Sequence, residues 1–446
     1  MTVTLSRPLS GFEHFFRSRT ASDFYTNFQV TATYSLPLSL STIYHGLRGL
    51  LLQYPIFASN VVKRSDDCYF EPIAPATLKD ILTIVDDDSF LTDGVVNEKY
   101  LKFINLIRFS FYDNSPLFKL YLVDGIHLTV VLEHTIADGL VGPYFHQIFL
   151  DKVLSKGVED ATVTWDSEVF NFQRDMDLLG SLPAPIDDYL PPYTIDYGPT
   201  VDKNIPLSHP SKWPGRFASD YNVPIAFKLI HITPEQVGRI LSKCKLEKVS
   251  LTSYLQIIHS MIIGNVIGQD HYSSQRVAIS LRRFIDPEKI LTPYYVASAA
   301  HSGLAMNLPP ITEFTWDLVR EVYSYLQQYV NNNKLLNTFT GFYNVYDKLE
   351  DNRNFFAQNM DKDRADSVKL SNLGLIKFPQ TGKLTVTNLV FAQDVMAFST
   401  DFMLNAISTE TGGLNLVWSY FERTEADSLQ PLVEVFRKYL LQYIEI

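Results

Sequence analysis

The pattern of apolar and polar residues predicts a hairpin that leads through a loop into a helix. Residues 126–132 form an apolar, β-branched run, and residues 117–123 form a second run of the same kind. The tight-turn pair Asp124-Gly125 joins them, which indicates two antiparallel strands. From residue 139 to about residue 154 the apolar positions recur at helical spacing. Residues 133–138 are therefore expected to turn between the end of a strand and the start of a helix.

The rest of the chain mixes the same two kinds of element. Apolar positions at helical spacing predict helices at residues 11–19, 39–54, 233 onward, 250–268, 314–331 and 432–446. Alternating or β-branched runs predict strands at residues 24–35, 106–112, 225–232, 276–281, 368–373, 384–391, 401–407 and 414–421. Strands and helices do not alternate regularly, so the mixture favours an α+β fold with largely antiparallel strands over a doubly wound parallel sheet.

A proline-rich segment divides the chain. Prolines gather between residues 175 and 214, where few apolar runs occur. The length of 446 residues fits two or three domains. We therefore predict an N-terminal lobe at 1–180, a proline-rich crossover at 181–215 and a C-terminal lobe at 216–446. Ligands commonly bind at the interface of two such halves.

Composition and charge exclude several classes of protein. Hydrophobic residues make up 46% of the chain and charged residues 20%, which is typical of a compact globular protein. The net charge of -11 argues against nucleic-acid binding. The two cysteines, Cys68 and Cys244, cannot form a disulfide framework and match no zinc pattern, so a reducing compartment is expected. The 30 phenylalanines and 25 tyrosines suit large cores and an apolar cavity.

No segment predicts a signal peptide or a membrane span. The first residues lack a long apolar stretch, and polar residues interrupt the best candidate span at 251–268, which we interpret as a buried helix. The helices at 11–19 and 432–446 could lie on a membrane surface, but packing on the lobes explains them equally well. We expect a cytoplasmic monomer, with peripheral membrane contact as the alternative.

The loop at 133–138 carries the most distinctive chemistry. His134 is followed at the fourth position by Asp138 and then by Gly139, an H-x-x-x-D-G pattern. A histidine at the end of a strand can serve as a general base, because its usual pKa of about 6.5 leaves it neutral at cellular pH. Without this context the spacing is a weak signal, and a structural loop histidine is the competing interpretation. Gly139 and the preceding strand argue against a helix that would aim His134 and Asp138 at one ion, so no metal is expected.

Two further motifs leave alternatives open. Arg282 and Arg283 follow a predicted strand, and they either end it in solvent or supply a buried ion-pair partner for Asp138. Ser371 and Asn372 end another predicted strand. They either form a turn or provide donors that stabilise an oxyanion.

These motifs occur in an order that resembles the fungal alcohol acetyltransferases, within the group that includes chloramphenicol acetyltransferase, the plant BAHD acyltransferases and peptide-synthetase condensation domains. The D-F-G-W-G segment of the plant enzymes is absent, and Asp401-Phe402 keeps only its first two letters, which favours the fungal branch. The landmarks are Arg7-Pro8-Leu9, Glu13, Arg19, Gln53-Tyr54-Pro55, His134 to Gly139, Ser280 to Arg283, Ser371 to Gly374 and the closing strand and helix at 414–446.

The resemblance implies two similar lobes of mixed sheets flanked by helices, with a central tunnel between them. Acetyl-CoA would enter from one face as co-substrate and an alcohol from the other. Fungal relatives often associate with the endoplasmic reticulum or lipid droplets through terminal amphipathic helices, a contact that the helices at 11–19 and 432–446 could make. His134 would take the proton from the acceptor hydroxyl as that oxygen attacks the thioester, with no covalent acyl-enzyme. In the relatives the aspartate pairs with an arginine, so Asp138 becomes structural, Arg282 its partner and Arg283 the alternative. Ser371 or Asn372 would contact the tetrahedral intermediate or the acceptor.

Two other functions compete with ester synthesis. An N-acetyltransferase of the same fold, acting on an amine such as a sphingoid-base analogue, would use His134 in the same way. A non-catalytic protein that binds a lipophilic small molecule would have no need of a base, so an intact His134 and Asp138 argue against it.

Overall fold

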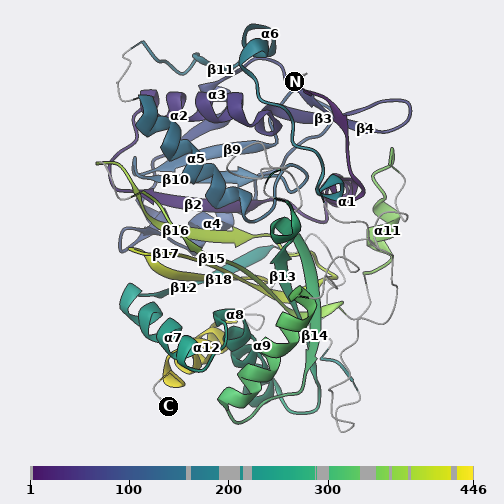
Figure 1. Ribbon diagram of the computed structural model, residues 1–446, viewed down its shortest axis with the longest axis vertical. Coiled ribbons are helices and arrows are strands. Elements are labelled where there is room, and N and C mark those ends of the chain that lie inside the picture. The colour runs from purple at the N-terminus through teal and green to yellow at the C-terminus, as the bar shows by residue number, and fades with distance from the viewer. Residues whose placement is uncertain are drawn as a thin grey trace.

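Two mixed sheets lie one above the other, and helices pack against both of them (Figure 1). This arrangement comes from a computed structural model, which describes residues 4–156, 162–189, 211–213, 224–286, 288, 301–331, 348–360, 364–379, 383–422 and 429–444. Each sheet has its own apolar core, and a third cluster of buried side chains lies between them. The fold is therefore α+β with mixed sheets flanked by helices, as the sequence predicted.

The N-terminal sheet has five strands, and the predicted hairpin is at its centre. Asp124 and Gly125 adopt φ angles of 49° and 66°, the left-handed conformation that a tight two-residue hairpin turn requires. Neighbouring strands are antiparallel except for β6 and β9. Helices α2 (Leu40–Gln53) and α5 (Val141–Lys156) pack together over this sheet. The strand order is β16 (Val386–Gln393), β2 (Phe28–Tyr34), β10 (His127–Leu132), β9 (Phe118–Val123) and β6 (Leu82–Val85).

The C-terminal sheet has six strands, and the helices that pack against it lie in the lower half of Figure 1. Strand β15 pairs in parallel with both of its neighbours, and the remaining pairs are antiparallel. The strand order is β12 (Ile225–Ile232), β18 (Gly413–Phe421), β17 (Thr400–Thr409), β15 (Asp366–Ile376), β13 (Ser273–Ser280) and β14 (His301–Leu308). The helices are α7 (Pro234–Leu246), α8 (Leu251–Ile262), α9 (Trp316–Asn331) and α12 (Gln430–Gln442).

Shorter elements surround the N-terminal sheet. Helix α1 (Gly11–Ala21) begins with a capping box, in which the side chains of Ser10 and Glu13 each accept from the other's backbone N–H. The others are β1 (Arg7–Pro8), β3 (Ser59–Lys63), β4 (Cys68–Pro72), β5 (Ala76–Thr77), α3 (Leu78–Ile81), β7 (Leu91–Thr92), β8 (Val95–Val96), α4 (Glu98–Asn105), β11 (Glu168–Phe170), α6 (Phe172–Asp175) and α11 (Arg353–Ala357).

Two predicted elements differ from the structure. The strand predicted at 106–112 is wrong, because helix α4 ends at Asn105 and the chain after it is irregular. The side-chain amides of Asn27 and Asn60 donate to the backbone carbonyls of Ile107 and Ser110, so side chains take the place of a neighbouring strand along this segment. The helix predicted at 250–268 is present, but it is not one continuous α-helix. Helix α8 ends at Ile262, and a π-helical turn continues over Ile263–Ile267.

The C-terminal part of the chain completes the N-terminal sheet. Strand β16 is antiparallel to β2, with Phe391 opposite Val30, although the two strands are far apart in sequence. A hydrogen bond of 2.7 Å from Gln393 on β16 to Asn405 on β17 then joins the two sheets. The predicted crossover at 181–215 lies largely outside the described residues, so the proposed division at 1–180 and 216–446 stays a prediction.

No helix in the described ranges combines the length and the apolar character that a membrane span needs. The best candidate from the sequence forms α8, and its residues from Ser253 to Ile262 are buried within the C-terminal core. The interpretation of this segment as a buried helix is therefore confirmed.

His259 on α8 makes the stability of the protein sensitive to acid. Its imidazole packs against Trp418 and Phe436, and neither ring nitrogen has a hydrogen-bond partner among the described residues. Burial lowers the pKa of His259 to about 3, and burial likewise lowers the pKa of His146 to about 4. Between about pH 6.5 and pH 4, these two histidines are therefore protonated in the unfolded chain but neutral in the folded chain. The free energy of unfolding falls as the pH falls through this range.

We expect His259→Phe to reduce this loss of stability. Between pH 7 and pH 5, His259 should lower the free energy of unfolding by about 2 kcal/mol, because only the unfolded chain takes up its proton. Urea unfolding at the two pH values measures the difference, which should be smaller in the variant by that amount. The exposed His231 gives the control His231→Phe. Equal losses in the parent and in His259→Phe would contradict a neutral, buried imidazole.

Candidate active site

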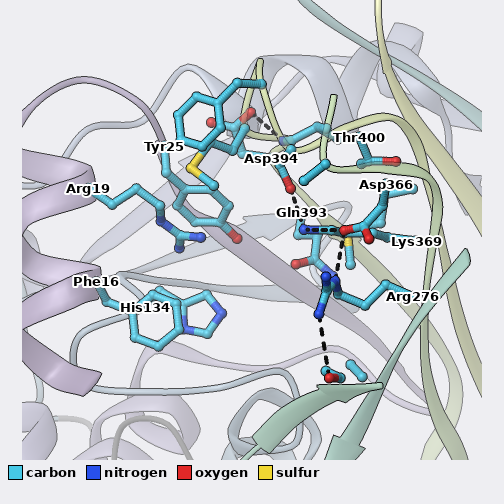
Figure 2. Close-up of a pocket in the computed structure, with 18 of the residues that line it drawn as sticks. Phe16, Arg19, Tyr25, His134, Arg276, Asp366, Lys369, Gln393, Asp394 and Thr400 are labelled. Carbon is cyan, nitrogen blue, oxygen red and sulfur yellow. Dashed lines mark hydrogen bonds and ion pairs between the residues drawn. The ribbon is translucent and has the colours of Figure 1, made fainter. Parts of the chain in front are cut away.

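His134 lies just after β10, at the boundary between the two lobes. Its imidazole stacks on the ring of Phe16 from α1, with ring centroids 3.9 Å apart and an interplanar angle of 9°. The rings of Tyr25 and Phe28 meet it at steeper angles, with centroids at 5.8 Å and 5.3 Å. The residue is 7% exposed, and that exposure opens into the pocket shown in Figure 2. Aromatic packing therefore fixes the plane of the imidazole and leaves an edge accessible to a small molecule.

The loop after His134 is held by a buried ion pair. Arg282 donates from Nη1 and Nη2 to Oδ2 and Oδ1 of Asp138, at 2.8 Å and 2.9 Å. Asp138 Oδ1 also accepts from the backbone N–H of Leu140 at 3.2 Å. Arg283 is exposed and takes no part in this pair. Of the two arginines that the sequence offered, the structure brings Arg282 to Asp138.

Gly139 lets the loop pack closely against the C-terminal lobe. A Cβ atom at this position would lie 3.0 Å from Cδ2 of Leu373 and 3.4 Å from the ring of Phe391. The loop therefore contacts both β15 and β16, so residues from widely separated parts of the chain set its position.

Glu133 ties the same loop to α1. Its carboxyl accepts from the hydroxyl of Thr20 at 2.7 Å and from the backbone N–H of Thr135. The side chain is fully buried, and burial raises the pKa of the Glu133 carboxyl above its usual range. The carboxyl of Glu133 thus joins the helix that carries Phe16 to the loop that carries His134, and it also fixes the backbone just after the histidine.

Two cavities reach His134. The larger has a volume of about 550 Å³ and extends from α1 to the strands of the C-terminal sheet. The smaller has a volume of about 100 Å³ and is bordered by Asp138, Gly139, Ser371 and Asn372. The volume of the larger falls in the range of pockets that hold small-molecule ligands. A single imidazole therefore borders two spaces that can admit two different reactants.

Ser371 and Asn372 are neighbours on β15 and border the smaller cavity, but their side chains differ in hydrogen bonding. The Asn372 amide donates to Thr252 Oγ1 at 3.2 Å, and its carbonyl accepts from Gly374 N at 2.9 Å. Asn372 therefore shapes the end of β15, whereas no such bond within the described chain occupies the Ser371 hydroxyl. Ser371 is the better candidate for contact with a reactant.

The larger cavity has a charged wall that the sequence pattern does not predict. Arg276 donates from Nε to Asp366 Oδ2 at 2.7 Å, and Lys369 Nζ lies 3.5 Å from the same oxygen and bonds to Ser399 (Figure 2). Burial lowers the pKa of Lys369 to about 8. The two basic residues sit on neighbouring strands that are adjacent only in the fold. Their spacing in the sequence gave no signal.

Arg19 on α1 faces this wall across the cavity. In the sequence, Arg19 is a landmark of the resemblance with no predicted role. Its guanidinium lies over the ring of Tyr25 at 3.6 Å and near that of Phe16 at 4.7 Å. It reaches the cavity beside His134, as Figure 2 shows.

The chain is similar to known acetyltransferases in sequence. The family model described as alcohol acetyltransferase matches residues 9–440. An uncharacterized protein of Schizosaccharomyces pombe is 22% identical over 431 residues, covering 93% of this chain and 92% of that protein. Alcohol O-acetyltransferase 2 of Saccharomyces cerevisiae is 23% identical over 339 residues, covering 67% of this chain and 62% of that enzyme.

Solved structures with the same fold include an acetyltransferase and a condensation domain. The TRI3 trichothecene 15-O-acetyltransferase from Fusarium sporotrichioides gives a TM-score of 0.66 at 12% identity, covering 98% of this chain and 95% of that one. The first condensation domain of the CDA synthetase gives 0.62 at 11% identity, covering 99% and 97%. The two-lobed fold predicted from the sequence is therefore confirmed. The chain belongs to the alcohol acetyltransferase family and is an acyltransferase.

Proposed function

We propose that the protein transfers an acetyl group from acetyl-CoA to the hydroxyl of an alcohol, with His134 as the general base. The observation that carries this proposal is that His134 borders two cavities while its loop is fixed by the pair of Asp138 and Arg282. Membership of the alcohol acetyltransferase family supports acyl transfer to an alcohol. A base held between two reactants needs no covalent acyl-enzyme.

The reaction consists of two proton transfers and one exchange of bonds. His134 accepts the proton of the acceptor hydroxyl as the oxygen attacks the thioester carbonyl and forms a tetrahedral intermediate. The C–S bond then breaks, the ester is released, and the imidazolium returns the proton to the departing thiolate. General-base catalysis contributes about 10² to 10⁴-fold, and the alignment of two bound reactants contributes more.

We assign the larger cavity to the acceptor and the smaller to the thioester end of acetyl-CoA. A thioester on a thin, extended arm suits a space of about 100 Å³, whereas an acceptor of varied size suits about 550 Å³. Ser371 borders the smaller cavity together with His134, so its hydroxyl is our candidate donor to the oxyanion of the intermediate.

A panel of alcohols and amines tests this function. Incubation of the purified protein with acetyl-CoA and each acceptor, followed by measurement of free CoA and of the product, should give esters from alcohols. Turnover of amines alone would reassign the protein as an N-acetyltransferase, because His134 can deprotonate either acceptor. Saturable binding of the acceptors without release of CoA would indicate a non-catalytic binding protein.

A further inference from the structure

We propose that the acceptor carries a carboxylate as well as the hydroxyl that is acetylated, and that Arg19 binds this carboxylate. The inference rests on the proposed function and names the acceptor class as hydroxycarboxylic acids. Arg19 is a buried cation beside His134, and the described residues supply no counter-ion in direct contact with it.

Arg19 is buried without an ion pair. It is 8% exposed, and no carboxylate oxygen of the described chain lies within the 4.0 Å that defines an ion pair. Its Nε and Nη2 atoms have no hydrogen-bond partner in the described residues. Cation–π contacts with Tyr25 and Phe16 compensate only part of the cost of removing a guanidinium from water. A carboxylate in the cavity would supply both a counter-ion and hydrogen-bond acceptors for the guanidinium.

Burial lowers the pKa of Arg19 and the charges of Glu133 and Asp394 oppose that shift, but the oxygens of both carboxyls accept hydrogen bonds from other groups. Glu133 accepts from Thr20 and Thr135, as described above. The two oxygens of Asp394 accept from the backbone N–H groups of Thr26 and Val395, each at 2.7 Å. Burial raises the pKa of both carboxyls, which weakens their charge. Neither one neutralises Arg19 by direct contact.

The opposite wall adds to the positive field of the cavity. Arg276 and Lys369 share the carboxylate of Asp366, and Asp394 also borders the cavity, so three basic side chains face it with two acids. A neutral alcohol would leave this excess of positive charge uncompensated. An acceptor with one negative charge would balance it, because charges interact more strongly inside a protein than in water.

The phosphates of acetyl-CoA cannot take this position. Arg19 lies near the Phe16 ring on which His134 stacks, so it is close to the site of the reaction. In coenzyme A the phosphates lie at the far end of the extended pantetheine arm from the sulfur. An anion at Arg19 must therefore belong to the acceptor or to the acyl group, and the size of the cavity favours the acceptor.

Matched acceptors test the inference. We would measure kcat/KM with acetyl-CoA for a series from hydroxybutyrate to hydroxyoctanoate, each compared with its methyl ester, which has the same hydroxyl but no charge. We expect the best acid to exceed its ester at least about 10-fold, the usual effect of a hydrogen bond to a charged group. Arg19→Met should bring this ratio close to one, and Arg19→Lys should restore part of it. Arg64→Met is the control, because Arg64 is an exposed arginine outside the cavity.

Each outcome decides the question. Acid-to-ester ratios near one in the parent, with turnover of the esters, would overturn the inference and leave the proposed function intact. A ratio that survives Arg19→Met would also overturn it, and the parent ratio still decides if that variant does not fold. In a further arm, the neutral esters are assayed with malonyl-CoA in place of acetyl-CoA. An Arg19-dependent preference for malonyl-CoA would mean that Arg19 binds a carboxylate of the acyl group, which would overturn the acceptor assignment. No turnover of any acceptor would reject the proposed function, and this inference with it.

Discussion

Replacing His134 with alanine should lower turnover of the best alcohol at least about 100-fold, while the fold and the binding of acetyl-CoA persist. The loss follows from the removal of the base, since a positioned general base contributes about 10² to 10⁴-fold. The remaining activity would come from the alignment of the two reactants in their cavities. Release of free CoA measures the rate. A thermal melt tests whether the fold persists, and a titration measures the binding of acetyl-CoA.

A second variant must distinguish the loss of the base from the loss of packing, because the imidazole also stacks on Phe16. His134→Gln keeps a polar side chain of similar size without a base, so it should lose as much activity as His134→Ala with less effect on the melting temperature. His231→Ala removes an exposed histidine on β12 and serves as the control. Rates for His134→Gln close to those of the parent would exclude His134 as the base.

The sequence could predict the position of the loop because the signals there are local. The alternation of residues 126–132, the turn at Asp124-Gly125 and the helical run after Gly139 all act over a few residues, and each element forms where it was expected. The fold class and the family also follow from the order of such local motifs. The partner of Asp138 needed the resemblance in addition, because Arg282 is distant in sequence.

The cavity could not be predicted, because its chemistry depends on packing between distant strands. Arg276 and Lys369 belong to β13 and β15, whose parallel pairing depends on the whole C-terminal sheet. Arg19 is one of two arginines on a short helix, and the stacking of Phe16 on His134 brings it close to the histidine. The misplaced strand at 106–112 has the same origin, since its backbone carbonyls accept from the side chains of Asn27 and Asn60, which are distant in sequence. Long-range contacts of this kind leave no periodic trace in a sequence.

Asp138→Asn should reduce both stability and activity, because it leaves Arg282 as a buried charge without its counter-ion. The side chains of Asp138 and Arg282 are 3% and 11% exposed, and loss of one member of a buried ion pair costs about 3–5 kcal/mol. The asparagine keeps the shape of the aspartate, so the effect reports the charge. The loop would also hold His134 less well, and a misplacement of about 1 Å can cost about 100-fold in rate.

Thermal melts and CoA release on the same preparations test this expectation, and an exposed pair provides the comparison. Asp166 and Lys79 are 75% and 58% exposed, so Asp166→Asn should leave the melting temperature and the rate unchanged. The double variant Asp138→Asn with Arg282→Met should be more stable than Asp138→Asn alone, because methionine removes the stranded guanidinium. If Asp138→Asn melts with the parent, the pair does not hold the loop. A large loss of rate would then have to come from direct contact between Asp138 and a reactant, which the ion pair with Arg282 argues against.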